Sequence, residues 1–175
     1  WEDRATCIFF AVGSGAMVLK QEDTACRRFH YARSMGDEQG IIHSDAPLPL
    51  KLFEKQIYTP SLVRMNGSET FRFAVKAMQE SMEAVLQQAG VKMEEIDWII
   101  PHQANSRIIA NVCRRCHIDM AHVYMNIAEY GNTSAASIPL ALGEMKEKGL
   151  LNEGMKLVLS GFGAGFTWAG AYIEL

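Results

Sequence analysis

The residue with the clearest chemical potential is His102, which stands in the run PHQAN at residues 101–105. The apolar stretch Ile96 to Ile100 before it predicts a buried strand, and the residues after it have helical spacing. Ligands collect at the carboxyl ends of strands in open α/β sheets, so a histidine at this corner is well placed for chemistry. A histidine that only caps or supports the turn is the alternative.

A second candidate is Asn132, in the run YGNTSAAS at residues 130–137. Small and polar residues before a predicted helix let a backbone or a ligand approach closely, and the Asn132 side chain offers a neutral amide donor. Asn, Thr and Ser are also the residues that build ordinary turns and helix caps. Both interpretations stay open for this run.

A third candidate is the run SGFGAGF at residues 160–166. Its glycines could direct backbone N–H groups toward an anion or an oxyanion. A tight connection between two strands explains the glycines equally well.

The run CRRCH at residues 113–117 has the spacing of a covalent haem c attachment site. Helical spacing, however, places Cys113 and Cys116 on the same apolar stripe as Ile109 and Val112, where a free cysteine packs as a small hydrophobic residue. A zinc site would need a second ligand pair, and the other two cysteines are not spaced as one. We therefore predict packing rather than a haem or metal site here.

The other face of the same predicted helix carries Arg107, Asn111, Arg114 and Arg115, which form one basic stripe. A solvated surface is the usual explanation for such a stripe. This one begins about one turn after His102, so an acidic partner docked on it would bring its cargo near the candidate catalytic corner.

Several elements must position these groups. Apolar residues at helical spacing predict helices at residues 71–89, 104–116 and 138–148, with Pro139 in the first turn of the last one. Strands are predicted at residues 96–100, 157–160 and 167–175. Two further short strands are predicted within Thr6 to Leu19, on either side of its glycines, and another at the start of a long irregular segment over 40–66. This alternation favours an α/β layered domain on a mixed sheet.

Composition sets the class of protein. The chain has 175 residues, 49% apolar and 21% charged, with a net charge of −3, which predicts one soluble globular domain over residues 1–175. No apolar run approaches the ~18 residues of a membrane span, and scattered positive charge argues against nucleic-acid binding. Four cysteines and no secretory signal indicate a cytoplasmic protein. Because the chain opens on Trp1, we expect it to be a piece of something longer.

Five motifs occur together and in order: DRATC at residues 3–7, MNG at 65–67 followed by Phe71, PHQAN at 101–105, GNTSAAS at 131–137 and GFTW at 165–168. Together they resemble the C-terminal half of β-ketoacyl-[acyl-carrier-protein] synthase III, a condensing enzyme of the thiolase superfamily. The resemblance covers nearly the whole chain. It implies a thiolase-like layered α/β domain with a mixed five-stranded sheet covered by helices, and an N-terminal half that is absent here.

The resemblance also implies a catalytic apparatus. Family members use a Cys-His-Asn triad, whose histidine and asparagine fall on His102 and Asn132. The nucleophilic cysteine belongs to the absent half, so the chain alone is expected to be inactive. The implied reaction is a decarboxylative Claisen condensation that starts fatty acid synthesis: an acyl group, typically acetyl, passes from acyl-CoA to the cysteine and is attacked by decarboxylated malonyl-[acyl-carrier-protein]. No cofactor beyond these thioester substrates is implied.

Further roles follow from the same resemblance. Asn105 and its neighbour Ala104 match the substrate-binding region that contacts the pantetheine arm, and Phe166 is expected beside the active-site cavity. Ala164 stands in an oxyanion loop where glycine is frequent. The matched partners are the acyl carrier protein, received by a basic patch at Arg107, Arg114 and Arg115, acyl-CoA, and a second copy in a full-length homodimer.

One run departs from the family pattern, because residues 11–16 read AVGSGA where a GDGAGA run is usual. Two other functions stay open. One is a synthase III relative that makes a polyketide or quinolone precursor, and the other is a non-catalytic domain that docks the carrier protein.

Overall fold

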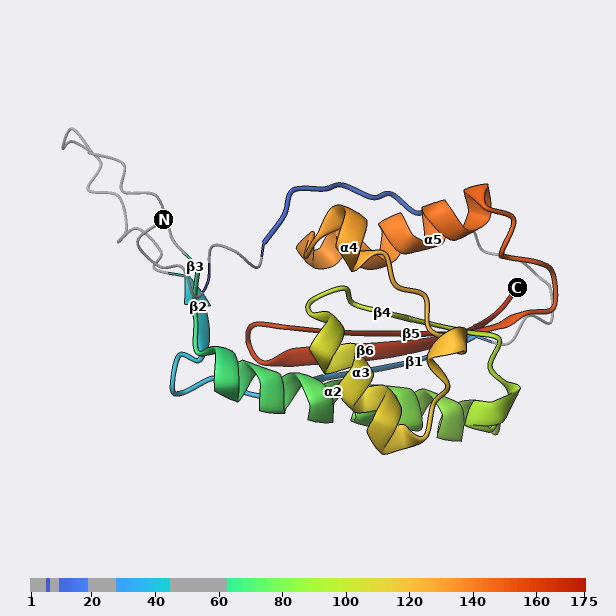
Figure 1. Cartoon of the computed structure of the whole chain (residues 1–175). Coiled ribbons are helices and arrows are strands. Elements are labelled where there is room, and N and C mark those ends of the chain that lie inside the picture. Colours follow the sequence, from blue (N-terminus) through green and yellow to red (C-terminus); the bar gives the residue numbers. More distant parts are fainter. Residues whose placement is uncertain (1–5, 7–9, 19–27, 45–62) are drawn as a thin grey trace.

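The computed structural model describes residues 6, 10–18, 28–44 and 63–175, and its centre is a four-stranded sheet (Figure 1). The strand order is β1-β6-β5-β4, formed by Arg28–Ser34, Thr167–Glu174, Lys156–Gly163 and Trp98–Pro101. Strands β4 and β5 are parallel, and the other two pairs are antiparallel. The sheet is therefore mixed, as the sequence predicts.

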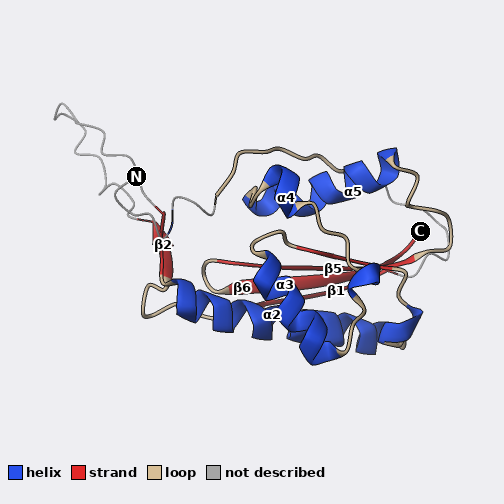
Figure 2. Ribbon diagram, in the orientation of Figure 1, coloured by secondary structure: helices blue, strands red, loops and turns tan. Residues whose placement is uncertain are grey.

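Helices cover both faces of this sheet (Figure 2). Helices α2 (Gly67–Ala89) and α3 (Ser106–Cys116) pack on one face, and α5 (Ser137–Glu147) packs on the other, next to the short α4 (Ile127–Tyr130). Three single turns of 3₁₀-helix complete the connections, η1 (Met93–Glu95), η2 (Met120–His122) and η3 (Ser134–Ala136). The predicted layered α/β architecture, with helices covering a mixed sheet, is thus confirmed.

Alternation along β4 divides the core into two parts. Ile99 packs with the apolar stripes of α2 and α3, whereas Ile100 packs with Ala141 and Met145 of α5. Successive side chains of a strand point to opposite faces, so a short, fully apolar strand is what a sheet covered on both sides requires. The prediction of a buried strand ending at Pro101 is confirmed.

Helix α2 is the longest element, and both of its ends have a local cause. The Asn66 side chain accepts a hydrogen bond from the Glu69 backbone N–H at the N-terminus, and Gly90 ends the helix with a positive φ of 65°. Between them, the stripe predicted over residues 71–89 faces the sheet. The first turn, which precedes that stripe, comes from the Asn66 cap.

Helix α3 begins at Ser106, two residues later than the spacing predicts. The Asn105 side chain accepts from the Arg107 backbone N–H at 2.9 Å and so acts as the N-cap. Cys113 is buried in the core under this helix, and Cys116 packs against the same cluster. The predicted hydrophobic role of these two cysteines is confirmed.

The last helix and hairpin follow the prediction with one change. Pro139 lies in the first turn of α5, and Gly149 has a positive φ of 68° just past its end. Strand β5 continues through Gly163, opposite Thr167 of β6. The predicted turn over 161–165 is therefore shorter, because Gly161 and Gly163 take part in the ladder.

The segment Thr6 to Leu19 is predicted as two short strands, and its described part, Thr6 and residues 10–18, contains no strand. Its one bridge among the described residues joins Phe10 to Asn132. Residues 7–9 of the first predicted strand lie outside the described residues, so the main sheet has four strands in the described part of the chain and the fifth stays a prediction. Strands β2 (Ile42–Ser44) and β3 (Val63–Met65) pair separately as the two ends of the 40–66 excursion.

The rest of that excursion, residues 45–62, lies outside the described residues, as does most of the DRATC motif at 3–7. In the described part of the chain, no helix is long and apolar enough to cross a membrane.

Candidate functional site

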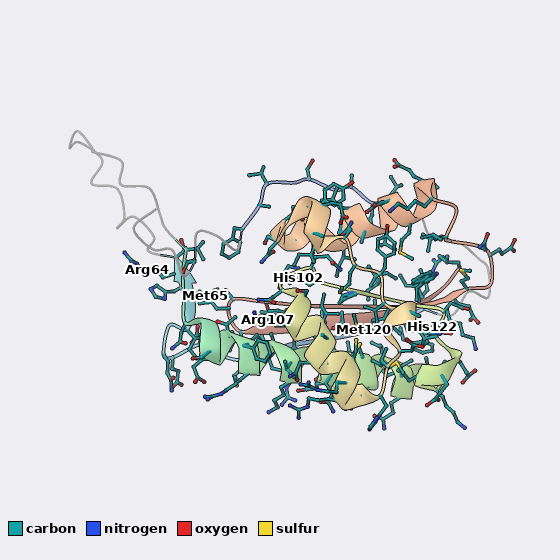
Figure 3. The ribbon with its side chains drawn as sticks, viewed as in Figure 1. Arg64, Met65, His102, Arg107, Met120 and His122 are labelled. Atoms are coloured by element: carbon teal, nitrogen blue, oxygen red, sulfur yellow. The ribbon has the colours of Figure 1, made fainter. Side chains whose placement is uncertain are left out.

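Two of the predicted residues from separate segments, His102 and Asn132, line one cavity of about 270 Å³. His102 follows β4 directly and precedes α3, and Figure 3 shows it beside the start of that helix, where Arg107 also lies. Ala104, Asn105 and Ala164 line the same cavity. The fold thus gathers five predicted site residues around one space.

Both the backbone and the ring of His102 are held by neighbouring residues. The His102 backbone N–H donates to the Ser160 carbonyl at 2.7 Å, which fixes the residue to β5. Its Nδ1 lies 2.7 Å from the Ser137 hydroxyl, and the Phe162 ring stands across it at 5.3 Å between centroids, tilted by 66°. Burial lowers the pKa of His102 to about 4, since the charged ring loses its hydration. The ring is therefore neutral at pH 7.

The Gln103 side chain holds the connection between β4 and α3 in place. Its side chain is buried, with its amide nitrogen donating to the Pro101 and Tyr124 carbonyls at 2.8 and 3.2 Å and its oxygen accepting from the Asn126 backbone N–H. These bonds connect the end of β4 to the loop before α4. The backbone on both sides of His102 is thus fixed to the sheet and to this loop.

Asn132 is buried and oriented by its own turn. Its carbonyl accepts from the Ala11 backbone N–H at 2.7 Å, and its side-chain Oδ1 accepts from the Ser134 backbone N–H at 2.9 Å. The residue is 8% exposed. Because the oxygen of the amide is engaged, its Nδ2 is the atom that remains to donate into the cavity.

The remaining walls of the cavity are mostly apolar. They come from the β2–β3 pair, from both helices of that face and from β5, and include Ile42, Met65, Phe71, Ile108 and Phe162. Hydrogen bonds strengthen in such surroundings, because little water competes for the donors. A narrow apolar cavity with a few convergent polar groups is the usual form of a ligand site.

A second, more open cavity of about 810 Å³ lies over the sheet face beside α5. Its walls include residues of β1 and β6, such as Ala32, Thr167 and Ala169. His102 and Phe162 line both cavities, so the candidate site can be reached from two sides.

Phe166 is the predicted site residue that lies elsewhere. It is 4% exposed and stacks on Phe73 of α2 at 3.8 Å, beside Trp168, and it is not among the lining residues of either cavity. Phe162, near the end of β5, takes the place at the cavity wall. Both phenylalanines fall in the glycine-rich run and both contact Phe73, but Phe162 stands in β5 against the His102 ring, whereas Phe166 lies in the β5–β6 turn.

Two further residues at the site had no predicted role, Ser137 and Gln103. Ser137 belongs to the GNTSAAS run, whose small and polar residues assign no separate role to its hydroxyl. Gln103 stands between His102 and Ala104 in the PHQAN run. A buried polar residue needs partners, but the sequence does not show which groups those are.

Ala164 and Asn105 have neighbours of their own. The Ala164 carbonyl accepts from the Thr167 hydroxyl at 3.2 Å within the β5–β6 turn, and Ala164 lines the cavity. The Asn105 oxygen caps α3, which leaves the amide nitrogen of Asn105 for a ligand.

The basic stripe lies on the outer face of α3. Arg107 is in the first turn and Arg114 and Arg115 are in the last, and all three are exposed. None of them forms an ion pair with another described residue. No cluster of potential metal ligands occurs among the described residues.

Comparison with known proteins shows the family of the chain. The family described as 3-oxoacyl-[acyl-carrier-protein (ACP)] synthase III C terminal matches residues 86–175. A β-ketoacyl-[acyl-carrier-protein] synthase III of Clostridium tetani is 42% identical over 183 residues, covering 99% of this chain and 55% of that protein. The chain thus spans about half the length of the curated relatives it matches.

Solved structures agree with this result. The 3-oxoacyl-[acyl-carrier-protein] synthase III of Aquifex aeolicus has a TM-score of 0.83 at 33% identity, over 99% of this chain and 52% of the other. The synthase III of Thermus thermophilus has a TM-score of 0.80 at 34% identity, over 99% of this chain and 54% of the other. The chain therefore belongs to the 3-oxoacyl-[acyl-carrier-protein] synthase III family, and it corresponds to the C-terminal region of that family.

Proposed function

We propose that this chain is the C-terminal catalytic domain of a 3-oxoacyl-[acyl-carrier-protein] synthase. In this proposal the whole enzyme condenses an acyl group from acyl-CoA, typically acetyl, with malonyl-[acyl-carrier-protein], with loss of CO₂, and so starts fatty acid synthesis. The observation that carries the proposal is the convergence of His102 and Asn132 on one apolar cavity.

The difficult species of this reaction is the enolate formed when the malonyl group loses CO₂, because negative charge develops on its thioester oxygen. Two neutral donors aimed at that oxygen stabilise it without delivering a proton to the carbon that must attack. The depressed pKa of His102, caused by burial, keeps the imidazole neutral, and Asn132 is neutral at every pH. These properties support the assignment of both residues as enolate donors.

The acyl-accepting cysteine is proposed to come from the part of the relatives that this chain does not span. The larger cavity opens beside His102 on the sheet face next to α5, so a nucleophile from a neighbouring element would meet the histidine there. The narrower cavity, with Asn105 and Ala104 at its wall, would then hold the pantetheine arm. His102 lines both cavities, so it can donate to the malonyl thioester oxygen next to the acylated cysteine.

The carrier protein is proposed to dock on α3. Its acidic surface would meet Arg107, Arg114 and Arg115, which are exposed and unpaired in the described part of the chain. Arg107 follows Asn105, the helix cap that lines the cavity, so docking here would place the arm at the cavity entrance.

The enzyme assignment is tested in a full-length synthase that carries this chain. His102→Ala should lower malonyl decarboxylation by ~10²–10³, the usual effect of losing one such donor, while acyl loading of the cysteine is largely retained. His30→Ala, which removes an exposed histidine of β1, is the matched control. Unchanged condensation in His102→Ala would reject the assignment.

The docking surface is tested separately by charge reversal. Arg107→Glu combined with Arg114→Glu should weaken carrier-protein binding, measured by titration calorimetry, and should raise KM for malonyl-[acyl-carrier-protein] more than it lowers kcat. Lys146→Glu, an exposed charge on α5, is the control. Binding that survives the double reversal would remove α3 as the docking surface.

The substrate class is tested by profiling acyl-CoA thioesters with the same full-length enzyme. Preference for acetyl-CoA or another short primer supports a role in starting fatty acid synthesis. Products of the polyketide or quinolone type would instead favour that alternative. Carrier-protein binding without any condensation would favour the non-catalytic docking domain.

A further inference from the structure

Ser137 is a buried serine at the first residue of α5, and its hydroxyl contacts the candidate catalytic histidine. Its Oγ lies 2.7 Å from His102 Nδ1, and it accepts a second, longer hydrogen bond of 3.3 Å from the Gln103 backbone N–H. The residue is 2% exposed. The hydroxyl therefore sits at the β4–α3 corner with little access to water.

The direction of the bond to His102 follows from what each group can do. A hydroxyl carries one proton to donate and can accept two bonds, whereas the Gln103 N–H can only donate. Among the described residues, His102 Nδ1 is the one acceptor within hydrogen-bond distance of this hydroxyl. A buried O–H that donates to nothing is costly, so the hydroxyl proton points at Nδ1.

The state of the ring completes the argument. Burial lowers the pKa of His102 to about 4, so near pH 7 the neutral ring carries a single N–H. If Nδ1 accepts from Ser137, that proton must be on Nε2. No described residue hydrogen bonds to Nε2, which leaves this atom for a ligand in the cavity.

We propose that Ser137 is a positioning residue that sets the tautomer of His102, holding the ring proton on Nε2 and presenting an N–H donor to the cavity. The catalytic consequence rests on the proposed function. With the proton on Nε2, the ring donates to the enolate oxygen. With the proton on Nδ1, the ring would present a lone pair to the same negative charge and oppose its formation.

The tautomer can be observed in the chain itself, without any activity. Uniformly ¹⁵N-labelled protein at pH 7 is examined by long-range ¹H–¹⁵N correlation of the imidazole rings, which separates protonated from unprotonated ring nitrogens. The chain has five histidines, and the His102 signals are those missing from the His102→Ala spectrum. Wild-type protein should show the proton on Nε2.

Three variants then test the cause. Ser137→Ala should give a mixture of both tautomers, and Ser137→Thr, which keeps a hydroxyl, should restore the Nε2–H form. Ser81→Ala is the matched control. Ser81 is a buried serine of α2, and its hydroxyl lies 2.8 Å from the Ser160 hydroxyl, away from the His102 ring. That variant should leave the His102 signals in the wild-type tautomer.

Two results would overturn the inference. One is a wild-type spectrum with the proton on Nδ1, which needs no variant and is independent of how Ser137→Ala folds. The other is an unchanged Nε2–H tautomer in a folded Ser137→Ala protein. In a full-length synthase, Ser137→Ala should also lower kcat for decarboxylation by up to about tenfold with little change in KM, the factor that one hydrogen bond is worth. If Ser137→Ala changes the tautomer as expected but leaves kcat for decarboxylation unchanged, the result would count against the proposed function instead.

Discussion

Replacing His102 by glutamine should flatten the dependence of stability on pH between about pH 7 and pH 4. The pKa of His102 falls from 6.5 to about 4 on folding, because burial removes hydration from the charged ring. The unfolded chain therefore binds a proton in a window where the folded chain does not. Stability rises with pH wherever the unfolded state binds more protons, so it is lost as the pH falls through this window.

The size of the effect follows from the two pKa values. Each tenfold change in a protonation equilibrium is worth about 1.36 kcal/mol, so the His102 contribution to the free energy of unfolding should fall by about 3 kcal/mol between pH 7 and pH 4. Glutamine does not titrate and can still accept a hydrogen bond from Ser137. The variant should lack this contribution altogether.

The assay is urea unfolding of the 175-residue chain at several pH values, followed by circular dichroism and fluorescence. Acidification also weakens the protein through carboxylates such as Glu80 and Glu144, whose pKa values are lowered by the hydroxyl of Tyr31 and the ammonium of Lys148 respectively. These groups are present in both proteins. The difference between wild type and His102→Gln therefore isolates the histidine.

His30→Gln, which removes an exposed histidine of β1, is the control and should follow the wild-type profile. Parallel profiles for wild type and His102→Gln, offset by a constant amount, would refute the reasoning. The ring would then titrate alike in the folded and unfolded chains, and the neutral donor assigned to His102 would lose its physical basis.

Three further substitutions test the scaffold of the site. Gly170→Ala should lower the free energy of unfolding by ~1–3 kcal/mol in thermal denaturation, because its Cβ would stand 2.6 Å from the Ser81 carbonyl oxygen, whereas Gly143→Ala, with open space around its Cβ, should be neutral or stabilising. Gln103→Leu should cost at least about 3 kcal/mol in urea unfolding, since three buried backbone groups lose their partner; a loss within error would mean that water replaces the amide. Asn105→Ala should cost ~1 kcal/mol through loss of the α3 cap, and Asn105→Ser should recover most of it; equal values for the two variants would show that the cap does not stabilise α3.

Local pattern was enough to predict most elements of the sheet and helices. Apolar spacing predicts α2, α3 and α5, and an apolar run ending at Pro101 predicts β4, because the periods of helices and strands are properties of neighbouring residues. The same local signals place His102 at a strand-to-helix corner. Prediction was weaker at element ends, where side-chain caps such as Asn105 decide the first helical residue.

The segment before Leu19 shows a limit of such reasoning. Residues 10–18 are predicted to contribute strands, yet among the described residues their one pairing is the bridge at Phe10, and strand formation depends on a neighbour as well as on propensity. The glycine-rich run has a similar ambiguity. Gly161 and Gly163 belong to β5 since β6 pairs with them, which extends the ladder into the predicted turn.

Sequence alone therefore determined the residue types that can do the chemistry, their local elements and the family that the motifs resemble. Only the tertiary structure brought Asn132 to the cavity beside His102, put Phe162 rather than Phe166 at its wall, and set the Ser137 hydroxyl against Nδ1. Each of these contacts joins segments that are far apart in the chain. Such contacts depend on strand order and helix packing, about which local periodicity carries no information.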